Sequence, residues 1–217
     1  MTVNELQSAI GVTADGQFGA VSRAALVAAL TNRNAPAATQ EDIARIAGRL
    51  GASAAQLRAV ASVESSGGGF DMQGRPKILF ERHLFHRLTD GKFSVAPFSQ
   101  SGGGGYSESS WDKLGAACAK DPDAAFSACS WGKFQVLGMH WSKLGYASPW
   151  DLAHSMTTGE AAHYELFARY IEAFGLKDAL RSVTSDPASC RAFATGYNGP
   201  GYKKFAYDTR IARGMMA

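Results

Sequence analysis

One carboxylate stands where the surrounding pattern calls for an apolar residue. In the stretch LRAVASVESSGGGF, Leu57, Val60 and Ala61 follow the i, i+3, i+4 spacing of a buried helix face. The next position on that face is Glu64, just before a Ser-Ser-Gly-Gly-Gly run that disfavours helix. Burial against apolar surface raises the pKa of a carboxyl group, as a general acid at neutral pH requires. The spacing also allows a glutamate that turns to solvent at a helix end.

Other residue types with chemical potential show no comparable pattern. His83 and His86 stand at i, i+3 near Glu81, but the remaining three histidines are far away in sequence and no HExxH spacing occurs. Neither a GxSxG motif nor a papain-like cysteine context is present. We therefore expect no metal site, no cofactor and no serine or cysteine nucleophile.

Composition limits the class of protein. The 217 residues are 46% hydrophobic and 11% aromatic, which suffices for a sizeable core. A net charge of +3 falls short of a nucleic-acid-binding signature, so no nucleic-acid partner is expected. No run reaches the length of a transmembrane helix, and the first residues lack the pattern of a signal peptide. Synthesis in the cytoplasm is the expectation, and it favours reduced thiols at Cys118, Cys129 and Cys190, with a Cys118–Cys129 bridge as the alternative.

Two capped helices are predicted to position Glu64. Thr39 with Asp42 forms a capping box for the first helix, which ends at Gly51. Ser53 with Gln56 caps the second helix, which carries the glutamate.

The rest of the chain also reads as mostly helical. Ahead of these helices lie a helical hairpin over 4–30 and a linker over 31–38. Beyond them we expect a short strand at Ile78–Phe80, a long loop over 94–110, and a helix capped by Thr157 with Glu160. Further helices are predicted over 110–119, 122–129, 150–155, 177–183, 187–195 and, as a basic helix, 201–213.

The hairpin carries a first resemblance. The phrase LQSAIGVTADGQFGAVSRAAL is similar to the second half of small helical peptidoglycan-binding domains, with Ser22 where their pattern has threonine. A unit of this size is too small for a core of its own. A truncated wall-binding element and an ordinary helical hairpin both fit.

Three ordered pieces carry a second resemblance. Glu64-Ser65, the SWGKFQ run ending at Gln135, and the GYNG run containing Tyr197 and Asn198 resemble the ES, SxGxxQ and AYNAG motifs of the lysozyme-like superfamily, especially lytic transglycosylases and goose-type lysozymes. From Thr39 onward the chain is more similar still to phage and prophage N-acetylmuramidases, with VESSGGGF, LFERHLF and WGKFQVLGMHW.

The resemblance implies a fold and a division of the chain. The expected fold is mainly α: a lysozyme-like multi-helix domain with at most a small β element, preceded by a short helical hairpin. The expected domains are residues 1–35, a truncated peptidoglycan-binding-like element and linker, and residues 36–217, the muramidase domain.

The implied activity is that of an endolysin. It would hydrolyse the β-1,4 bond from N-acetylmuramic acid to N-acetylglucosamine, with Glu64 as general acid. Direct hydrolysis calls for a second carboxylate, for which Glu81 is the best candidate and Asp71 and Glu108 are weaker ones. The alternative for Glu81 is a structural ion pair with Arg82 or Arg75.

The resemblance also suggests substrate contacts. Gln135 and Asn198 would hydrogen-bond substrate acetamido or hydroxyl groups, and Tyr197 would line the cleft near Glu64. Each has a structural alternative, since a buried amide can satisfy backbone groups and a tyrosine can fill a core.

Two other functions remain open. The first is a lytic transglycosylase that gives 1,6-anhydromuramic ends, whose motifs the chain resembles. Two departures from those motifs leave the reaction type open: Lys133-Phe134 replaces the usual Leu-Met, and Gly196 replaces the alanine. The second is a non-catalytic wall-binding phage structural protein. In every case peptidoglycan glycan strands are the expected partner.

Expectations about location and assembly follow from the same resemblance. The protein is expected to be a monomer that reaches the periplasmic wall after a holin permeabilises the membrane. The basic residues Lys203, Lys204, Arg210 and Arg213 could contact anionic membrane lipid or lipopolysaccharide, or form a solvated helix face.

Overall fold

The computed structural model describes residues 1–64, 68–93 and 109–216, so most of the predicted long loop and Glu108 lie outside it. The chain forms two compact units, each built from two segments. Unit 1 comprises residues 1–35 and 70–158, and unit 2 comprises residues 36–69 and 159–217. The chain passes from unit 1 to unit 2 between residues 35 and 36, and a functional division at that point stays a prediction.

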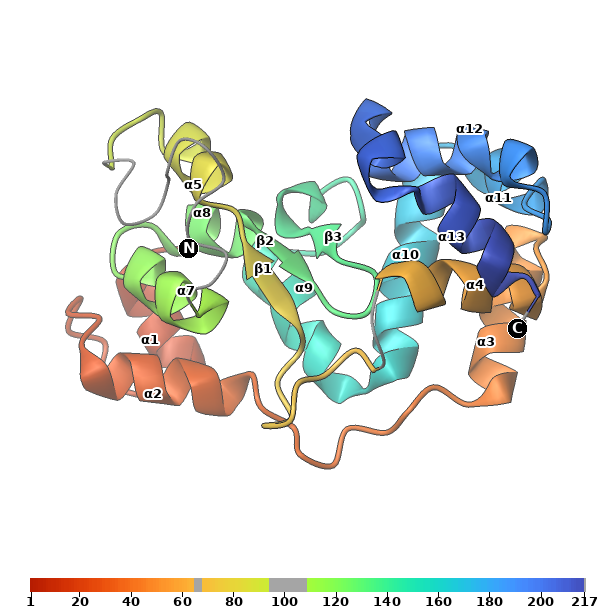
Figure 1. Cartoon of the computed structure of the whole chain (residues 1–217). Helices are drawn as coiled ribbons and strands as arrows, with labels where there is room; N and C mark the ends of the chain where they lie inside the picture. The colour runs from red at the N-terminus through yellow and green to blue at the C-terminus, as the bar shows by residue number, and fades with distance from the viewer. Residues whose placement is uncertain (65–67, 94–108, 217) are drawn as a thin grey trace. The chain divides into compact units, whose positions relative to one another are not determined.

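The mainly helical fold is confirmed. The described residues form many helices and one small three-stranded sheet (Figure 1). Among them, no helix combines the length and the apolar character needed to cross a membrane.

Unit 1 begins with the predicted hairpin, α1 (Val3–Ala9) and α2 (Ala20–Ala29). The buried Gln7 amide donates to Asp15 Oδ1 at 2.8 Å and to Ser22 Oγ at 3.1 Å, and its oxygen accepts the Gly16 N–H at 2.8 Å. Ser22 thus accepts a hydrogen bond that holds the two helices and their turn together.

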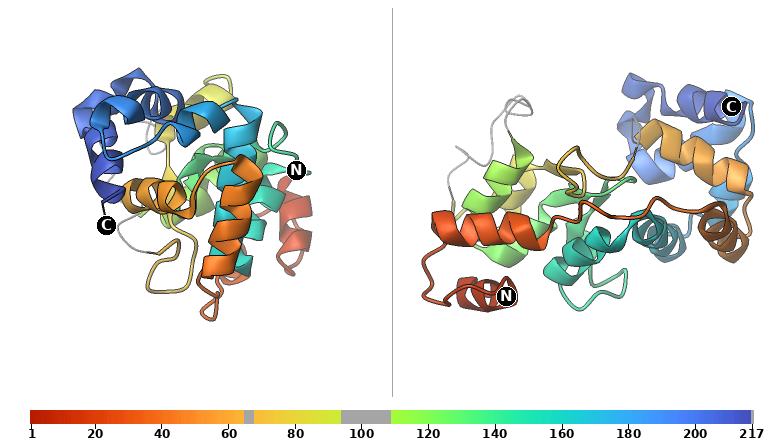
Figure 2. Two further views of the ribbon diagram at one scale, coloured as in Figure 1. Left: turned by 90° about the vertical axis from the view of Figure 1, so that its right-hand side faces the viewer. Right: turned by 90° about the horizontal axis from the view of Figure 1, so that it is seen from below.

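The hairpin packs on other helices of unit 1. Figures 1 and 2 show α2 beside α7 (Ser110–Cys118). The amino group of Met1 also pairs with Asp123 of α8 (Pro122–Ser127). These contacts give the hairpin a structural role, and its binding to the cell wall stays a prediction.

The sheet has the order β1-β2-β3, with antiparallel neighbours. Its strands are β1 (Ile78–Phe80), β2 (Cys129–Trp131) and β3 (Val136–Leu137). The β1 strand was predicted, whereas the prediction of helix through Cys129 was wrong. Cys129 instead pairs with Phe80, because the strand position buries both side chains completely or nearly so.

The three cysteines of the chain, Cys118, Cys129 and Cys190, are free and buried.

The remaining elements of unit 1 are short. These elements are α5 (Arg82–Leu88), the 3-10 helix η2 (Gly138–His140), α9 (Pro149–Ser155) and the 3-10 helix η3 (Met156–Thr158).

Unit 2 is wholly helical in its described residues. In Figures 1 and 2, α3 lies beside α10, and α13 lies against both α4 and α12. The elements are α3 (Gln40–Leu50), α4 (Ala54–Glu64), α10 (Glu160–Ala173), α11 (Lys177–Arg181), α12 (Pro187–Asn198), the 3-10 helix η4 (Pro200–Phe205) and α13 (Tyr207–Gly214).

The predicted caps of α3 and α4 are confirmed. Thr39 and Asp42 exchange both hydrogen bonds of a capping box. Ser53 and Gln56 do the same, with distances of 2.8 Å and 3.1 Å. The Gln56 amide also donates to the Val183 carbonyl at 2.9 Å, which ties the start of α4 to the C-terminal segment.

Two other helix predictions were wrong. The helix α10 is not capped by Thr157, because that residue belongs to η3 and donates to the His154 carbonyl. Its N-cap is Gly159, and the Glu160 carboxylate accepts the Gly69 N–H at 2.5 Å. The predicted basic helix over 201–213 is interrupted at Ala206, whose left-handed conformation (φ 50°) separates η4 from α13.

Candidate active site

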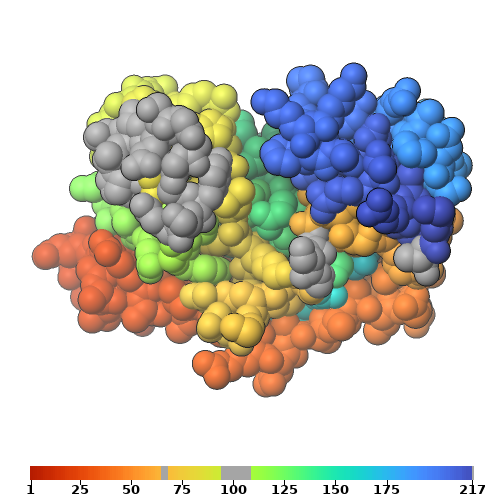
Figure 3. Space-filling model, in the orientation of Figure 1, coloured from red at the N-terminus to blue at the C-terminus, as the bar shows by residue number. Residues whose placement is uncertain are grey.

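Glu64 is the last residue of α4 and is half-buried. The helix turns Leu57, Val60 and Ala61 into the core of unit 2, so the i+7 position follows them to the edge of that core. On the face shown in Figure 3, the C-terminal helices (blue) lie against the orange segment that contains α4. The Glu64 carboxyl group is largely removed from solvent, and this burial raises its pKa.

Asn198 contacts this carboxyl group directly. It is the last residue of α12, and its Nδ2 donates to Glu64 Oε1 at 3.0 Å. The Asn198 Oδ1 atom is buried and has no hydrogen-bond partner among the described residues. The amide is thus oriented by its bond to the acid.

Two tyrosines share the surroundings of Glu64. Tyr197 packs in an aromatic cluster with ring centroids 5.5 Å from Phe193 and 5.2 Å from Tyr170. Burial raises the pKa of Tyr197 well above its ordinary value, and the Glu64 charge raises it further. Burial and the same carboxylate also raise the pKa of Tyr207 on α13.

Arg210 supplies a positive charge beside the acid. Its Nη2 donates to the Val63 carbonyl at 2.8 Å, at the C-terminal end of α4, where the helix dipole favours a cation. Its guanidinium also lies 5.5 Å from the centroid of the Tyr207 ring. Arg210 therefore fixes α13 to the last turn of α4, next to Glu64.

The electrostatic balance at Glu64 favours the protonated form. Burial raises its pKa from 4.5 to about 7, against the opposing effects of the Asn198 hydrogen bond and the Arg210 charge. Such a group is protonated in roughly half of the molecules at neutral pH. It can give a proton to a substrate and afterwards hold the negative charge.

Glu81 belongs to unit 1, whereas Glu64, Tyr197 and Asn198 belong to unit 2. It is the N-cap residue of α5, and its side chain is 18% exposed. The carboxylate lies 3.5 Å from His83 Nδ1.

Gln135 also belongs to unit 1, where its amide is engaged by its own turn. Its Nε2 donates to the Gly132 carbonyl at 2.8 Å, and its Oε1 accepts from Ser130 Oγ at 3.1 Å. The backbone of Gln135 is left-handed, with φ 49°, and these bonds stabilise that conformation. This is the structural alternative named for Gln135, and its role toward substrate stays a prediction.

Asp71, a weaker candidate for the second carboxylate, is committed to a turn. It pairs with Arg75 Nε at 2.7 Å and accepts the backbone N–H of Gln73 at 2.9 Å. Within residues 1–64, 68–93 and 109–216, no group of three or more His, Cys, Asp or Glu side chains could hold a metal ion.

Tyr207 was not among the predicted site residues. Arg210 was predicted only as a basic surface residue; it is exposed, and its side chain also bonds to the end of α4. The i, i+3 spacing of the two residues marks one helix face. Nothing local shows that this face meets α4, because the contact joins residues far apart in the chain.

The fold and the site together define a lysozyme-like, mainly α-helical domain with a half-buried glutamic acid. The structure is similar to the crystal structure of the Burkholderia AP3 phage endolysin, with a TM-score of 0.74 and 30% sequence identity over 99% of this chain and 93% of that chain. A comparison with curated proteins found no match. Residues 53–216 match the model of the Muramidase (N-acetylmuramidase) family, and the chain belongs to this family. The resemblance to phage N-acetylmuramidase endolysins is thereby confirmed.

Proposed function

We propose that the protein is an endolysin that hydrolyses the β-1,4 bond between N-acetylmuramic acid and N-acetylglucosamine, with Glu64 as general acid. Membership of the N-acetylmuramidase family supports peptidoglycan as the substrate. The observation that carries the assignment of the acid is the half-buried Glu64 carboxyl, whose pKa is raised to about 7.

The contacts of Glu64 suit both halves of a proton transfer. Asn198 binds Oε1, which leaves Oε2 to carry the proton toward the leaving oxygen of the glycosidic bond. Once the proton has left, the Asn198 hydrogen bond and the Arg210 charge both stabilise the carboxylate. The site therefore favours the acid before the transfer without making its conjugate base prohibitively unstable.

We assign Glu81 as the second carboxylate, which would activate the attacking water. The Glu81 carboxylate is mostly buried and lies 3.5 Å from His83 Nδ1, which supports this choice. Asp71, which pairs with Arg75, and Glu108, which lies outside the described residues, stay the weaker candidates.

Asn198 and Tyr197 are proposed to contact the sugar at the bond that is cleaved. Asn198 carries a buried oxygen available to a substrate N–H or O–H, since no described group donates to it. Tyr197 shares the surroundings of the acid. Gln135 is proposed to hydrogen-bond an acetamido or hydroxyl group of the substrate.

The decisive experiment uses Glu64→Gln, which keeps the shape of the side chain and removes the acid. We expect wild-type protein to clear purified sacculi and release reducing ends, and the variant to lose at least two orders of magnitude in rate. Glu41→Gln is the matched control, because Glu41 is an exposed residue of α3. A Glu64→Gln variant of wild-type rate would refute the assignment.

Mass spectrometry of the products separates the reaction types. Reducing muramic ends are the expected outcome of hydrolysis. Anhydromuramic ends would identify a transglycosylase, and binding of sacculi without any cleavage would identify a non-catalytic wall-binding protein. Gel filtration with light scattering tests the accompanying proposal that the protein acts as a monomer.

A further inference from the structure

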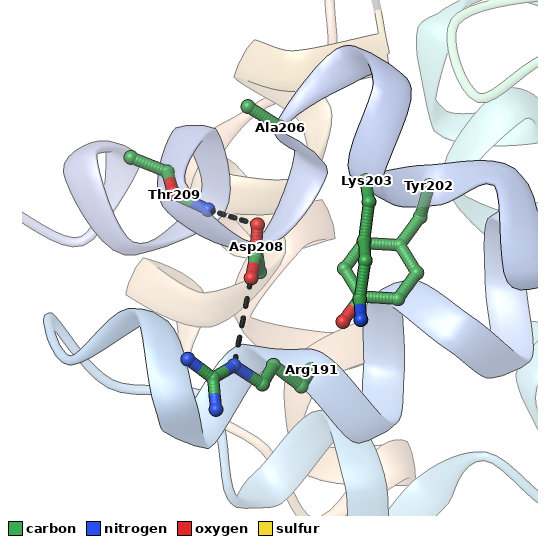
Figure 4. Close-up of a pocket in the computed structure, with 6 residues that line it drawn as sticks. All are labelled: Arg191, Tyr202, Lys203, Ala206, Asp208 and Thr209. Atoms are coloured by element: carbon green, nitrogen blue, oxygen red, sulfur yellow. Dashed lines mark hydrogen bonds and ion pairs between the residues drawn. The ribbon is translucent and has the colours of Figure 1, made fainter.

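A hollow in unit 2 is formed by residues of α12, η4 and α13. It has a volume of about 440 Å³ and is lined by Arg191, Tyr202, Lys203, Ala206, Asp208 and Thr209 (Figure 4). The left-handed backbone at Ala206 forms part of its wall, since it turns the chain from η4 into α13. Pockets of this size can hold a small polar group with its neighbouring carbons.

The lining has more hydrogen-bond donors than acceptors. Lys203 and Tyr202 extend side by side in Figure 4, with the ammonium and the hydroxyl at the same end. In the part of the chain that the structure describes, neither of these two groups makes a hydrogen bond or an ion pair. Tyr202 is nonetheless only 5% exposed, so its hydroxyl is held in place at the hollow.

The one acidic group of the lining is already partly engaged. One oxygen of Asp208 accepts the Thr209 N–H at 2.9 Å, and the other lies 3.7 Å from Arg191 Nε. This distance is too long for a hydrogen bond, so the Arg191 guanidinium keeps its donors available for a ligand. Two cationic side chains and a phenol thus face one carboxylate.

Along the chain, residues that line the hollow are close to two residues that interact with Glu64, namely Asn198 and Tyr207. Tyr202 and Lys203 follow Asn198 by four and five residues, and Asp208 directly follows Tyr207. Asn198 donates a hydrogen bond to Glu64, and the Glu64 charge raises the pKa of Tyr207. The helices α12 and α13, which line the hollow, thus also carry these two residues.

We infer that this hollow binds a carboxylate of the peptide stem that muramic acid carries, through Arg191, Lys203 and the Tyr202 hydroxyl. This inference rests on the proposed function for the identity of the substrate. Charge-assisted donors of these types suit a carboxylate. Arg191 and Lys203 against Asp208 leave the lining with one net positive charge, which a single carboxylate balances.

The test compares two forms of one substrate. Glycan strands with their peptides are assayed beside strands from which an amidase has removed the peptides. For Arg191→Gln combined with Lys203→Gln, we expect KM to rise about fivefold on the peptide-bearing strands and to stay unchanged on the stripped strands. Lys204→Gln is the control, because Lys204 is exposed next to Lys203 but does not line the hollow. An equal effect on both substrates, or none on the peptide-bearing strands, would overturn the inference.

A binding measurement keeps this test separate from the proposed catalytic function. NMR titration of Glu64→Gln protein with a soluble peptide-bearing disaccharide should shift the signals of Tyr202 and Lys203, and the peptide-free disaccharide should leave them unchanged. Inorganic phosphate at the same concentration should not displace the peptide-bearing ligand. Displacement by phosphate would refute the carboxylate assignment. If the peptide-bearing ligand bound but wild-type protein cleaved neither substrate, the proposed catalytic function would be contradicted and the binding inference would stand.

Discussion

The raised pKa of Glu64 predicts that this residue makes the folded protein less stable as the pH rises. Its pKa is about 7 in the folded chain and 4.5 in the unfolded chain. Between these values the folded state binds more protons than the unfolded state. The stability that this group contributes is therefore fully present below pH 4.5 and is lost as the pH rises through 7.

The size of the effect follows from the pKa difference. The shift of about 2.5 units from 4.5 to 7 corresponds to about 3 kcal/mol, at 1.36 kcal/mol for each unit. Glutamine cannot ionise, and it can still accept the hydrogen bond from Asn198. We therefore expect Glu64→Gln to be more stable than wild type by roughly 2–3 kcal/mol at pH 8, and equally stable at pH 4.5.

Chemical denaturation at pH 4.5, 6 and 8 measures the difference directly. Each pH compares wild type with Glu64→Gln, so the titration of all other groups cancels. Glu41→Gln, at an exposed position, should change the free energy of unfolding by no more than about 0.5 kcal/mol at any pH. A pH-independent difference between wild type and Glu64→Gln would show that Glu64 is not a group whose ionisation is opposed by burial.

Three further predictions concern the neighbours of the acid. Asn198→Ala removes a hydrogen bond to the charged form of Glu64, so the alkaline limb of the kcat/KM profile should move up by about one pH unit; a downward shift would contradict this. Arg210→Gln should move the same limb up by about half a unit, because this more exposed charge is better screened, and Arg210→Lys should restore most of the wild-type position. Gly69→Ala should lower the free energy of unfolding by at least 2 kcal/mol in denaturant, since a Cβ there would overlap a buried imidazole. Gly68→Ala, at an exposed position, should be tolerated, and equal losses would refute the steric argument.

The sequence predicted those features that depend on local spacing. The two capping boxes and the buried face of α4 follow from residues within four positions of one another. These local rules also place Glu64 at the end of its helix. They failed at Thr157, where a tertiary bond from Gly69 holds Glu160 and a capping box does not form.

Features that depend on long-range packing were not predictable in this way. The strand at Cys129 forms because β1, about 50 residues earlier, provides a partner. The contact of Asn198 with Glu64 spans 134 residues. The motif resemblance suggested the neighbourhood of Tyr197 and Glu64, but only the packing of α13 on α4 reveals the parts played by Tyr207 and Arg210.

The glycine run after Glu64 illustrates the same limit. From the sequence alone, the run indicates only that the helix ends there. The structure gives Gly69 a different requirement, since His163 occupies the space that a side chain would need.

Unit 2 is built from two segments that are far apart in the chain, and this affects the order in which its parts are synthesised. Glu64 emerges from the ribosome with the first segment of the unit, whereas Asn198 and Arg210 belong to the second. At ordinary rates of translation, the 134 residues from Glu64 to Asn198 take on the order of ten seconds to synthesise. During that interval Asn198 and Arg210 are not yet available to the Glu64 carboxylate and the end of α4. The surroundings of Glu64 described above therefore form only after the second segment of unit 2 has been made.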